Sequence, residues 1–68
     1  MPSTSIRQIA YDSDTRVLSV WFVSTGKRYD YAEVPPETYL AFRHAASKGR
    51  FFNAHIRDHY SYRLREAG

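Results

Sequence analysis

The dipeptide Pro35-Pro36 divides this chain into two halves that must fold differently. Proline has no backbone N–H and is excluded from central strands, so the pair ends any sheet that precedes it. Proline is favoured at the first position of a helix, where its missing N–H would be unpaired anyway. Glu37 follows and complements the helix dipole. The sequence therefore predicts strands before the dipeptide and helices after it.

Three segments of the first half have strand character. Residues 6–11 form a short run that ends at the turn-forming cluster of residues 12–15. Residues 16–23 alternate β-branched and aromatic side chains with both faces partly apolar, which is typical of a central strand. Gly26 can take a positive φ in the next turn, and residues 27–32 form a third strand. We expect an antiparallel meander of three strands.

The second half has helical periodicity. Tyr39, Phe42 and Ala46 recur at i, i+3 and i+7, which predicts a helix over about residues 36–48 with Gly49 as its C′ residue. Phe52 and Ile56 recur four residues apart, which predicts a second, shorter helix from residue 50 to about residue 59.

The C-terminal tail allows two placements. Tyr60, Tyr62 and Leu64 alternate, so the tail extends as a strand or lies over the core. The expected fold is α+β: a three-stranded antiparallel β-meander packed by one α-helix and followed by a second short helix. With 68 residues, the chain forms one domain spanning residues 1–68.

The core of so short a chain is thin, because such a domain buries only about 60% of its unfolded surface. There is no cysteine to form a disulfide, but six Tyr, four Phe and one Trp supply dense aromatic packing. The absence of cysteine fits a reducing compartment. No apolar run is long enough to span a membrane, and the N-terminus does not resemble a secretory signal. We therefore expect a cytoplasmic protein without a membrane partner.

Charge is concentrated near the C-terminus. Residues 43–65 contain six basic side chains and a single acidic one, Asp58, so this stretch has a net charge of +5. A basic surface of this kind raises the expectation of a polyanionic partner. It is equally typical of an ordinary solvated surface.

Two runs of residues resemble the KTSC domain, which occurs as a C-terminal extension of some lysyl-tRNA synthetases and as small free-standing bacterial proteins. Its mark is a central Tyr-x-Tyr, matched here by Tyr29 and Tyr31. The resemblance runs from about residue 5 to residue 60. It implies no catalytic residue, and it suggests RNA binding through the attachment to the synthetase. The matching residues are Leu18, Val20, Phe22, Gly26, Tyr29, Asp30, Tyr31, Val34 and Pro35, then residues 47–53, Ile56 and Arg57.

No catalytic or metal-binding constellation can be assembled from the residues. His55 and His59 are four residues apart on one helical face, but a structural zinc site normally needs four ligands and only Asp58 lies near them. No nucleophile-elbow motif and no glycine-rich phosphate loop occurs. We expect a binding protein that is not an enzyme and that has no cofactor, no metal and no small-molecule substrate.

The exposure of the aromatic side chains depends on the hairpin register. With a three-residue loop, Trp21 pairs with Tyr29, and the three aromatics Trp21, Tyr29 and Tyr31 share one face. With a two-residue loop, Phe22 pairs with Tyr29, the tyrosines join the core, and Trp21 lies on the outer face. A shift of one residue exchanges these two outcomes. We favour the core placement of the tyrosines, because large aromatic side chains mostly serve packing.

The sequence thus predicts a small RNA-binding module, with tRNA or single-stranded RNA as the ligand. The alternative is a protein-interaction or homodimerisation module that uses the face around Trp21. In the first case basic side chains contact phosphates while an aromatic side chain stacks on bases. The candidate binding residues are Trp21, Lys27, Arg28, Tyr29, Tyr31, Arg50 and Arg57.

Overall fold

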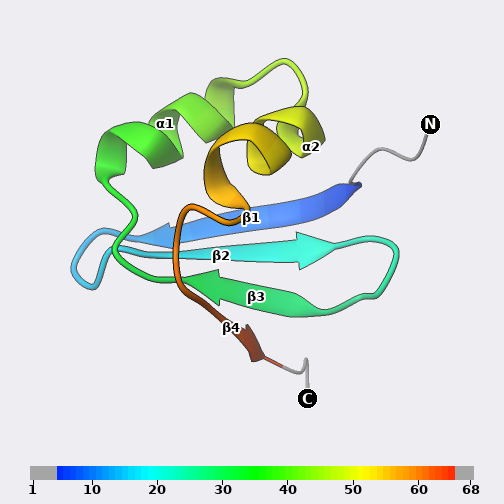
Figure 1. Cartoon of the computed structure of the whole chain (residues 1–68), viewed down its shortest axis with the longest axis horizontal. Helices are drawn as coiled ribbons and strands as arrows, with labels where there is room; N and C mark the ends of the chain where they lie inside the picture. The colour runs from blue at the N-terminus through cyan, green and yellow to red at the C-terminus, as the bar shows by residue number, and fades with distance from the viewer. Residues whose placement is uncertain (1–4, 66–68) are drawn as a thin grey trace.

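The computed structural model describes residues 5–65, which form an antiparallel sheet covered on one face by helices (Figure 1). The sheet has four strands in the order β1-β2-β3-β4. The strands are β1 Ile6–Asp12, β2 Val17–Phe22, β3 Arg28–Tyr31 and β4 Tyr62–Arg65. The helical part consists of α1 Pro36–His44, α2 Lys48–Phe51 and a single π-helical turn, η1, at Phe52–Ile56.

The expected meander of β1, β2 and β3 is present, but the prediction of three strands is wrong by one. The tail pairs with β3 as β4, with Tyr31 opposite Tyr62 and Arg28 opposite Arg65. The connection that leads into β4 is also bonded to the sheet, since the Ala32 amide donates to the Ser61 carbonyl at 2.9 Å. The alternating side chains of the tail allowed either a strand or a segment lying over the core. Backbone pairing to the free edge of β3 makes it a strand.

Turns occur where their residue types predict them. The side chain of Asp12 accepts hydrogen bonds from the backbone amides of Asp14 at 2.9 Å and Thr15 at 3.3 Å. Gly26 has a φ of 69°, and its amide donates to the Phe22 carbonyl at 2.9 Å. These bonds close the β1–β2 and β2–β3 connections.

The two helices divide the second half differently from the prediction. Proline does begin α1, but α1 ends at His44, four residues before the expected end. The side chain of Ser47 then accepts from the Arg50 amide at 3.3 Å and begins α2. Gly49, expected to end the first helix, lies buried within α2. An N-capping serine is favoured where a helix begins, so it separates the two helices here.

The core lies between the sheet and the helices. Its buried side chains come from β2, β3, the β3–α1 connection, α1 and η1: they are Leu18, Val20, Tyr31, Val34, Phe42, Phe52 and Ile56. Tyr11 of β1 stacks on Tyr39 of α1 with ring centroids 4.7 Å apart and donates its hydroxyl to the Val34 carbonyl at 2.6 Å. Within residues 5–65, no helix is long and apolar enough to cross a bilayer.

Candidate functional site

The hairpin register separates the aromatic side chains of β2 and β3 onto opposite faces. Val20 pairs with Tyr29, Leu18 with Tyr31 and Trp21 with Arg28. The register differs by two residues from the two-residue-loop alternative and by one from the three-residue-loop alternative. Because a shift of two residues preserves the face, the tyrosines lie on the helix-covered face and Trp21 lies on the other. The favoured core-side placement of the tyrosines is therefore confirmed, although neither expected loop length is.

The first candidate surface is the sheet face opposite the helices, which we call the open face. It is defined by Trp21, Arg28, Asp30, Arg63 and Arg65, which share this side through the pairing of β2, β3 and β4. The Arg28 guanidinium lies over the Trp21 ring, 5.4 Å from its centroid. Two shallow depressions adjoin it: Trp21 and Arg28 help to line one of about 390 Å³, and Asp30, Arg63 and Arg65 help to line one of about 360 Å³.

Asp30 organises the charges of the open face. Its carboxylate accepts a two-pronged bond from Arg28 at 2.8 and 3.0 Å and a bond from the Ser19 hydroxyl at 2.8 Å. The Arg65 guanidinium lies 3.5 Å away on the other side. The hydrogen bond from Arg28 lowers the pKa of Asp30, and the same bond raises the pKa of Arg28. Asp30 thus offsets the repulsion between Arg28 and Arg65, which face each other across β3 and β4.

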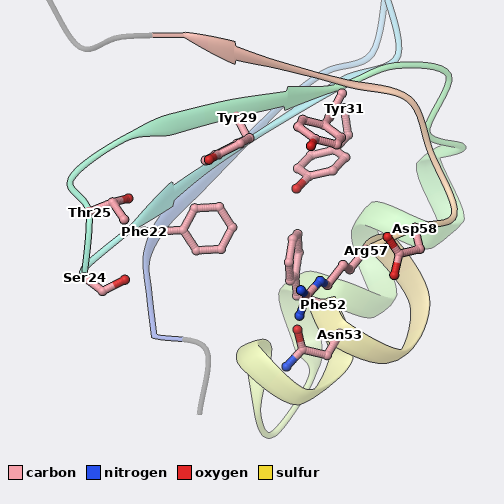
Figure 2. A pocket seen from close by; sticks show the side chains of 10 residues that line it. Phe22, Ser24, Thr25, Tyr29, Tyr31, Phe52, Asn53, Arg57 and Asp58 are labelled. Carbon is pink, nitrogen blue, oxygen red and sulfur yellow. The ribbon is translucent and has the colours of Figure 1, made fainter. Parts of the chain in front are cut away.

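The second candidate surface lies on the helix-covered face, where the helices leave a hollow beside β3 and β4. We call it the aromatic groove, and its volume is about 380 Å³. Figure 2 shows that its aromatic side chains point toward one another from the sheet and from η1. Its walls are Phe22, Tyr29, Tyr31, Phe52 and Tyr62.

The aromatic rings of the groove form a closed circuit. Phe22 lies 5.4 Å from Tyr29 and 5.2 Å from Phe52, measured between ring centroids. Tyr31 lies 5.5 Å from Phe52, and Tyr62 lies 5.5 and 5.6 Å from Tyr29 and Tyr31. The planes are inclined by 39° to 82°, so ring edges and ring faces alternate around the hollow. This arrangement stabilises the walls and also offers aromatic surface to a guest.

Polar side chains border the groove at both ends. Ser24 and Thr25 lie at the β2–β3 turn, while Asn53 lies in the first part of η1 and Arg57 and Asp58 directly follow it (Figure 2). The Arg57 amide donates to the Phe52 carbonyl at 2.8 Å, which closes the wide turn of η1. Asp58 then takes a φ of 66°, an uncommon conformation for a residue with a Cβ.

Burial governs the ionisation of the groove's deepest hydroxyl. Tyr31 is 4% exposed. Removal from water raises the pKa of Tyr31 to about 12, and the neighbouring hydroxyls of Tyr29 and Tyr62 add to the effect. The Tyr31 phenol therefore stays protonated, and able to donate a hydrogen bond, throughout the neutral pH range.

The structure does not bring together all of the residues predicted from the sequence. Trp21 and Arg28 lie on the open face, while Tyr29, Tyr31 and Arg57 line the aromatic groove. Two others belong to neither surface: Lys27 is exposed in the β2–β3 turn and Arg50 is exposed on α2.

Sequence reasoning missed Phe22, Phe52 and Tyr62 as groove walls and Arg63 and Arg65 as part of the open face. The alternation of residues 60–64 was the available signal for the β4 residues. Once that segment is a strand, Tyr62 and Leu64 must face the helices while the two arginines face away.

Within residues 5–65, no three His, Cys, Asp or Glu side chains are arranged to hold a metal ion. The His55 ring packs on Phe51 with centroids 4.5 Å apart. Both candidate surfaces combine aromatic rings with polar and charged side chains, including the carboxylates of Asp30 and Asp58.

Comparisons with known proteins agree on the family. The KTSC domain family model matches residues 2–60. An uncharacterised protein of Stutzerimonas stutzeri is 41% identical over 63 residues, which cover 91% of this chain and 87% of the relative. A lysine–tRNA ligase of Nostoc punctiforme is 35% identical over 57 residues; the match covers 84% of this chain but only 10% of the ligase.

A solved structure shows the same fold. The crystal structure of a KTSC domain protein from Yersinia pestis aligns with a TM-score of 0.84 and 37% identity. The alignment covers 100% of this chain and 92% of that one. Together with the match over residues 2–60, this similarity shows that the chain belongs to the KTSC domain family.

Proposed function

We propose that this domain is a non-catalytic RNA-binding module and that single-stranded RNA lies across its open face. The observation that carries the proposal is the composition of that face. Trp21 lies there opposite Arg28, Arg65 follows on the far side of Arg28, and Arg63 pairs with Asp30 in the neighbouring row. Sheet-based RNA modules combine an uncovered strand face, an aromatic ring for stacking and basic side chains for phosphates.

Charge balance supports a polyanion as the partner. Asp30 neutralises only part of the positive charge, since it bonds to Arg28 and lies beside Arg65. Phosphate contacts supply most of the affinity in such complexes and carry little sequence information. We therefore expect a weak preference among sequences, while stacking on Trp21 requires an unpaired base and favours single strands.

The similarity to part of a tRNA ligase also supports RNA as the partner. The similar segment in the Nostoc punctiforme protein belongs to a ligase whose name gives tRNA as its substrate. An accessory domain that holds RNA would serve such an enzyme without taking part in its chemistry. We extend this role to the present chain, whose partner would be tRNA or another RNA with unpaired bases.

The test uses Trp21, the single tryptophan of the chain, as its reporter. Single-stranded RNA and tRNA are titrated at two salt concentrations while tryptophan fluorescence is followed. We expect quenching at low salt and much weaker binding at high salt, because counterions are released from the phosphates. Absence of binding at low salt would contradict the proposal.

Variants locate the binding face. The double variant Arg63→Gln/Arg65→Gln should weaken binding about tenfold or more, since two phosphate contacts are lost. Trp21→Ala should cost about 1–3 kcal/mol of binding free energy, measured by the anisotropy of labelled RNA. Arg43→Gln, on the exposed side of α1, is the matched control and should change little. A comparable loss per arginine in Arg43→Gln, together with no loss in Trp21→Ala, would show that only net charge matters.

The alternative partner is a protein or a second copy of the chain, held on the same face around Trp21. An apolar interface of that kind depends little on salt, whereas RNA binding depends on it steeply. Sedimentation at two salt concentrations separates the two, because a dimer would persist at high salt and would be broken by Trp21→Ala.

A further inference from the structure

The aromatic groove and the open face meet at β4. Along this edge strand, Tyr62 and Leu64 point toward the helix side, while Arg63 and Arg65 point to the open face. All of β4 is exposed, so a ligand that lies along this edge can reach both surfaces. The two surfaces therefore share the edge strand β4.

We infer that the aromatic groove holds one unpaired nucleobase with its phosphate: a nucleotide, either free or splayed out from an RNA strand. The inference rests on the proposed RNA binding when the nucleotide belongs to a strand, and it stands alone when the nucleotide is free. The base would lie among the rings of the groove, and the phosphate would lie beside Arg57.

Size fits this occupant. The groove has a volume of about 380 Å³, at the lower end of the usual range for small-ligand sites of about 300–1,000 Å³. That volume admits a base and its sugar, but it is too small for several nucleotides. It is also larger than a bare methylated ammonium group requires.

Chemistry fits it as well. The rings of Phe22, Tyr29 and Tyr62 offer surfaces on which any base can stack, because every base has a π-face. The hydroxyl of Tyr31 and the carboxylate of Asp58 can bond to the polar edge of a base. A purely apolar peptide would use neither of these polar groups, whereas Arg57 supplies the positive charge that a phosphate requires.

Local backbone geometry suggests that the groove is a built feature. The π-helical turn at Phe52–Ile56 widens the helix where Phe52 enters the groove. Such turns occur frequently at functional sites. Arg57 ends this turn, and Asp58 directly after it takes a left-handed conformation. Uncommon backbone conformations cluster at ligand sites, where the surrounding structure maintains them.

The experiment is a titration of the full chain followed by ¹H–¹⁵N and aromatic NMR. The four ribonucleoside 5′-monophosphates are the probes, with ribose 5-phosphate as the control that lacks a base. We expect a nucleotide to shift the resonances of Tyr29, Phe52, Arg57 and Tyr62, and ribose 5-phosphate to shift them much less. Equal shifts from ribose 5-phosphate would overturn the claim that a base is bound.

Two groove variants make the test specific. Phe22→Leu keeps most of the apolar volume but removes one ring, and it lies away from β4. Arg57→Gln removes the cation. Each should weaken nucleotide binding about tenfold, while Arg43→Gln should not. Circular dichroism confirms that each variant is folded. Unchanged nucleotide affinity in both groove variants would overturn the inference.

A second arm separates the two sources of the nucleotide and the two proposals. A short single-stranded RNA is titrated into the native chain and Phe22→Leu. Groove shifts with RNA support a splayed base, and groove shifts with monophosphates alone support a free nucleotide while counting against the proposed RNA function. RNA binding that perturbs the open face, with no groove shifts from any probe, overturns the inference and leaves RNA binding intact.

Discussion

At the scale of single residues, Asp30 most clearly links packing to charge. It is half-buried in the centre of β3, and it holds Ser19 and Arg28 by hydrogen bonds. The carboxylate therefore fixes the guanidinium that lies over Trp21. A charged hydrogen-bonded carboxylate of this kind stabilises a fold more than an exposed surface ion pair does.

The change Asp30→Asn should lower the free energy of unfolding at pH 7 by about 1–2 kcal/mol, because charged hydrogen bonds are lost. The pKa of Asp30 is lowered in the folded protein, so the unfolded chain takes up the proton first. The stabilisation is present above the unfolded pKa of about 4 and is lost as the pH falls through the lower folded pKa.

Urea denaturation at pH 7 and at pH 3 measures the contribution of Asp30 to the free energy of unfolding. The native chain should lose more stability on acidification than the Asp30→Asn chain. Asp14→Asn, in the exposed β1–β2 turn, is the matched control and should behave as the native chain does. An identical acid dependence in all three chains would contradict the assigned role of Asp30.

At the scale of elements, α1 shows how little of a short helix the core requires. Phe42 is fully buried, whereas Leu40 is 49% exposed on the same helix. The helix therefore packs on the core through one narrow stripe of side chains. The ring of Phe42 also stacks on Phe51 with centroids 5.4 Å apart, which joins α1 to α2.

Phe42→Ala should therefore cost about 3–5 kcal/mol of unfolding free energy, because it leaves a cavity in the core. Leu40→Ala should change the value by less than about 0.5 kcal/mol. Thermal or urea unfolding of the two variants gives the comparison. Similar losses in both would mean that α1 packs through a different side.

The edge strand β4 is the second informative element. Its residues are all exposed, so few buried contacts oppose its local opening. The Ala32 amide points toward the β4 side, and by alternation so do the amides of Arg28 and Asp30. The amides of Tyr29 and Tyr31 point toward β2.

Native-state hydrogen exchange should therefore divide β3 into two classes. We expect the amides of Arg28, Asp30 and Ala32 to exchange at least tenfold faster than those of Tyr29 and Tyr31, because β4 opens without the rest of the sheet. Equal protection in the two classes would show that β4 opens only when the whole domain unfolds.

At the scale of the whole molecule, a single small sheet carries one candidate surface on each side. The helices cover one face only in part, which leaves the aromatic groove beside β3 and β4. The opposite face stays open and basic. The net charge of +3 acts on both surfaces and favours the approach of polyanions.

Salt dependence measures how many phosphates this surface contacts. If Arg28, Arg63 and Arg65 each contact one phosphate, the logarithm of the RNA association constant should fall with the logarithm of salt with a slope of about −2. The Arg63→Gln/Arg65→Gln variant should reduce the slope to about −1. A slope near zero would indicate an interface without phosphates.

The sequence by itself determined the three strands that precede Pro35, the turn at Asp12, the left-handed Gly26 and the start of α1 at Pro36. These features depend on local chemistry: a missing N–H, a side chain that bonds to its own turn, or a residue without a Cβ. The tertiary structure decided the rest. It ended α1 at His44, paired the tail as β4 and set the hairpin register.

The candidate site also depends partly on the sequence alone and partly on the tertiary structure. Trp21, Arg28, Tyr29, Tyr31 and Arg57 were predicted as binding residues and lie on the two candidate surfaces, but their separation onto opposite faces depends on the register. A single-residue difference in register would have placed the tyrosines beside Trp21. Register is fixed by the packing of Leu18 and Val20 against the helices, and β4 completes both surfaces. These are contacts between residues far apart in the chain, which local sequence patterns do not encode.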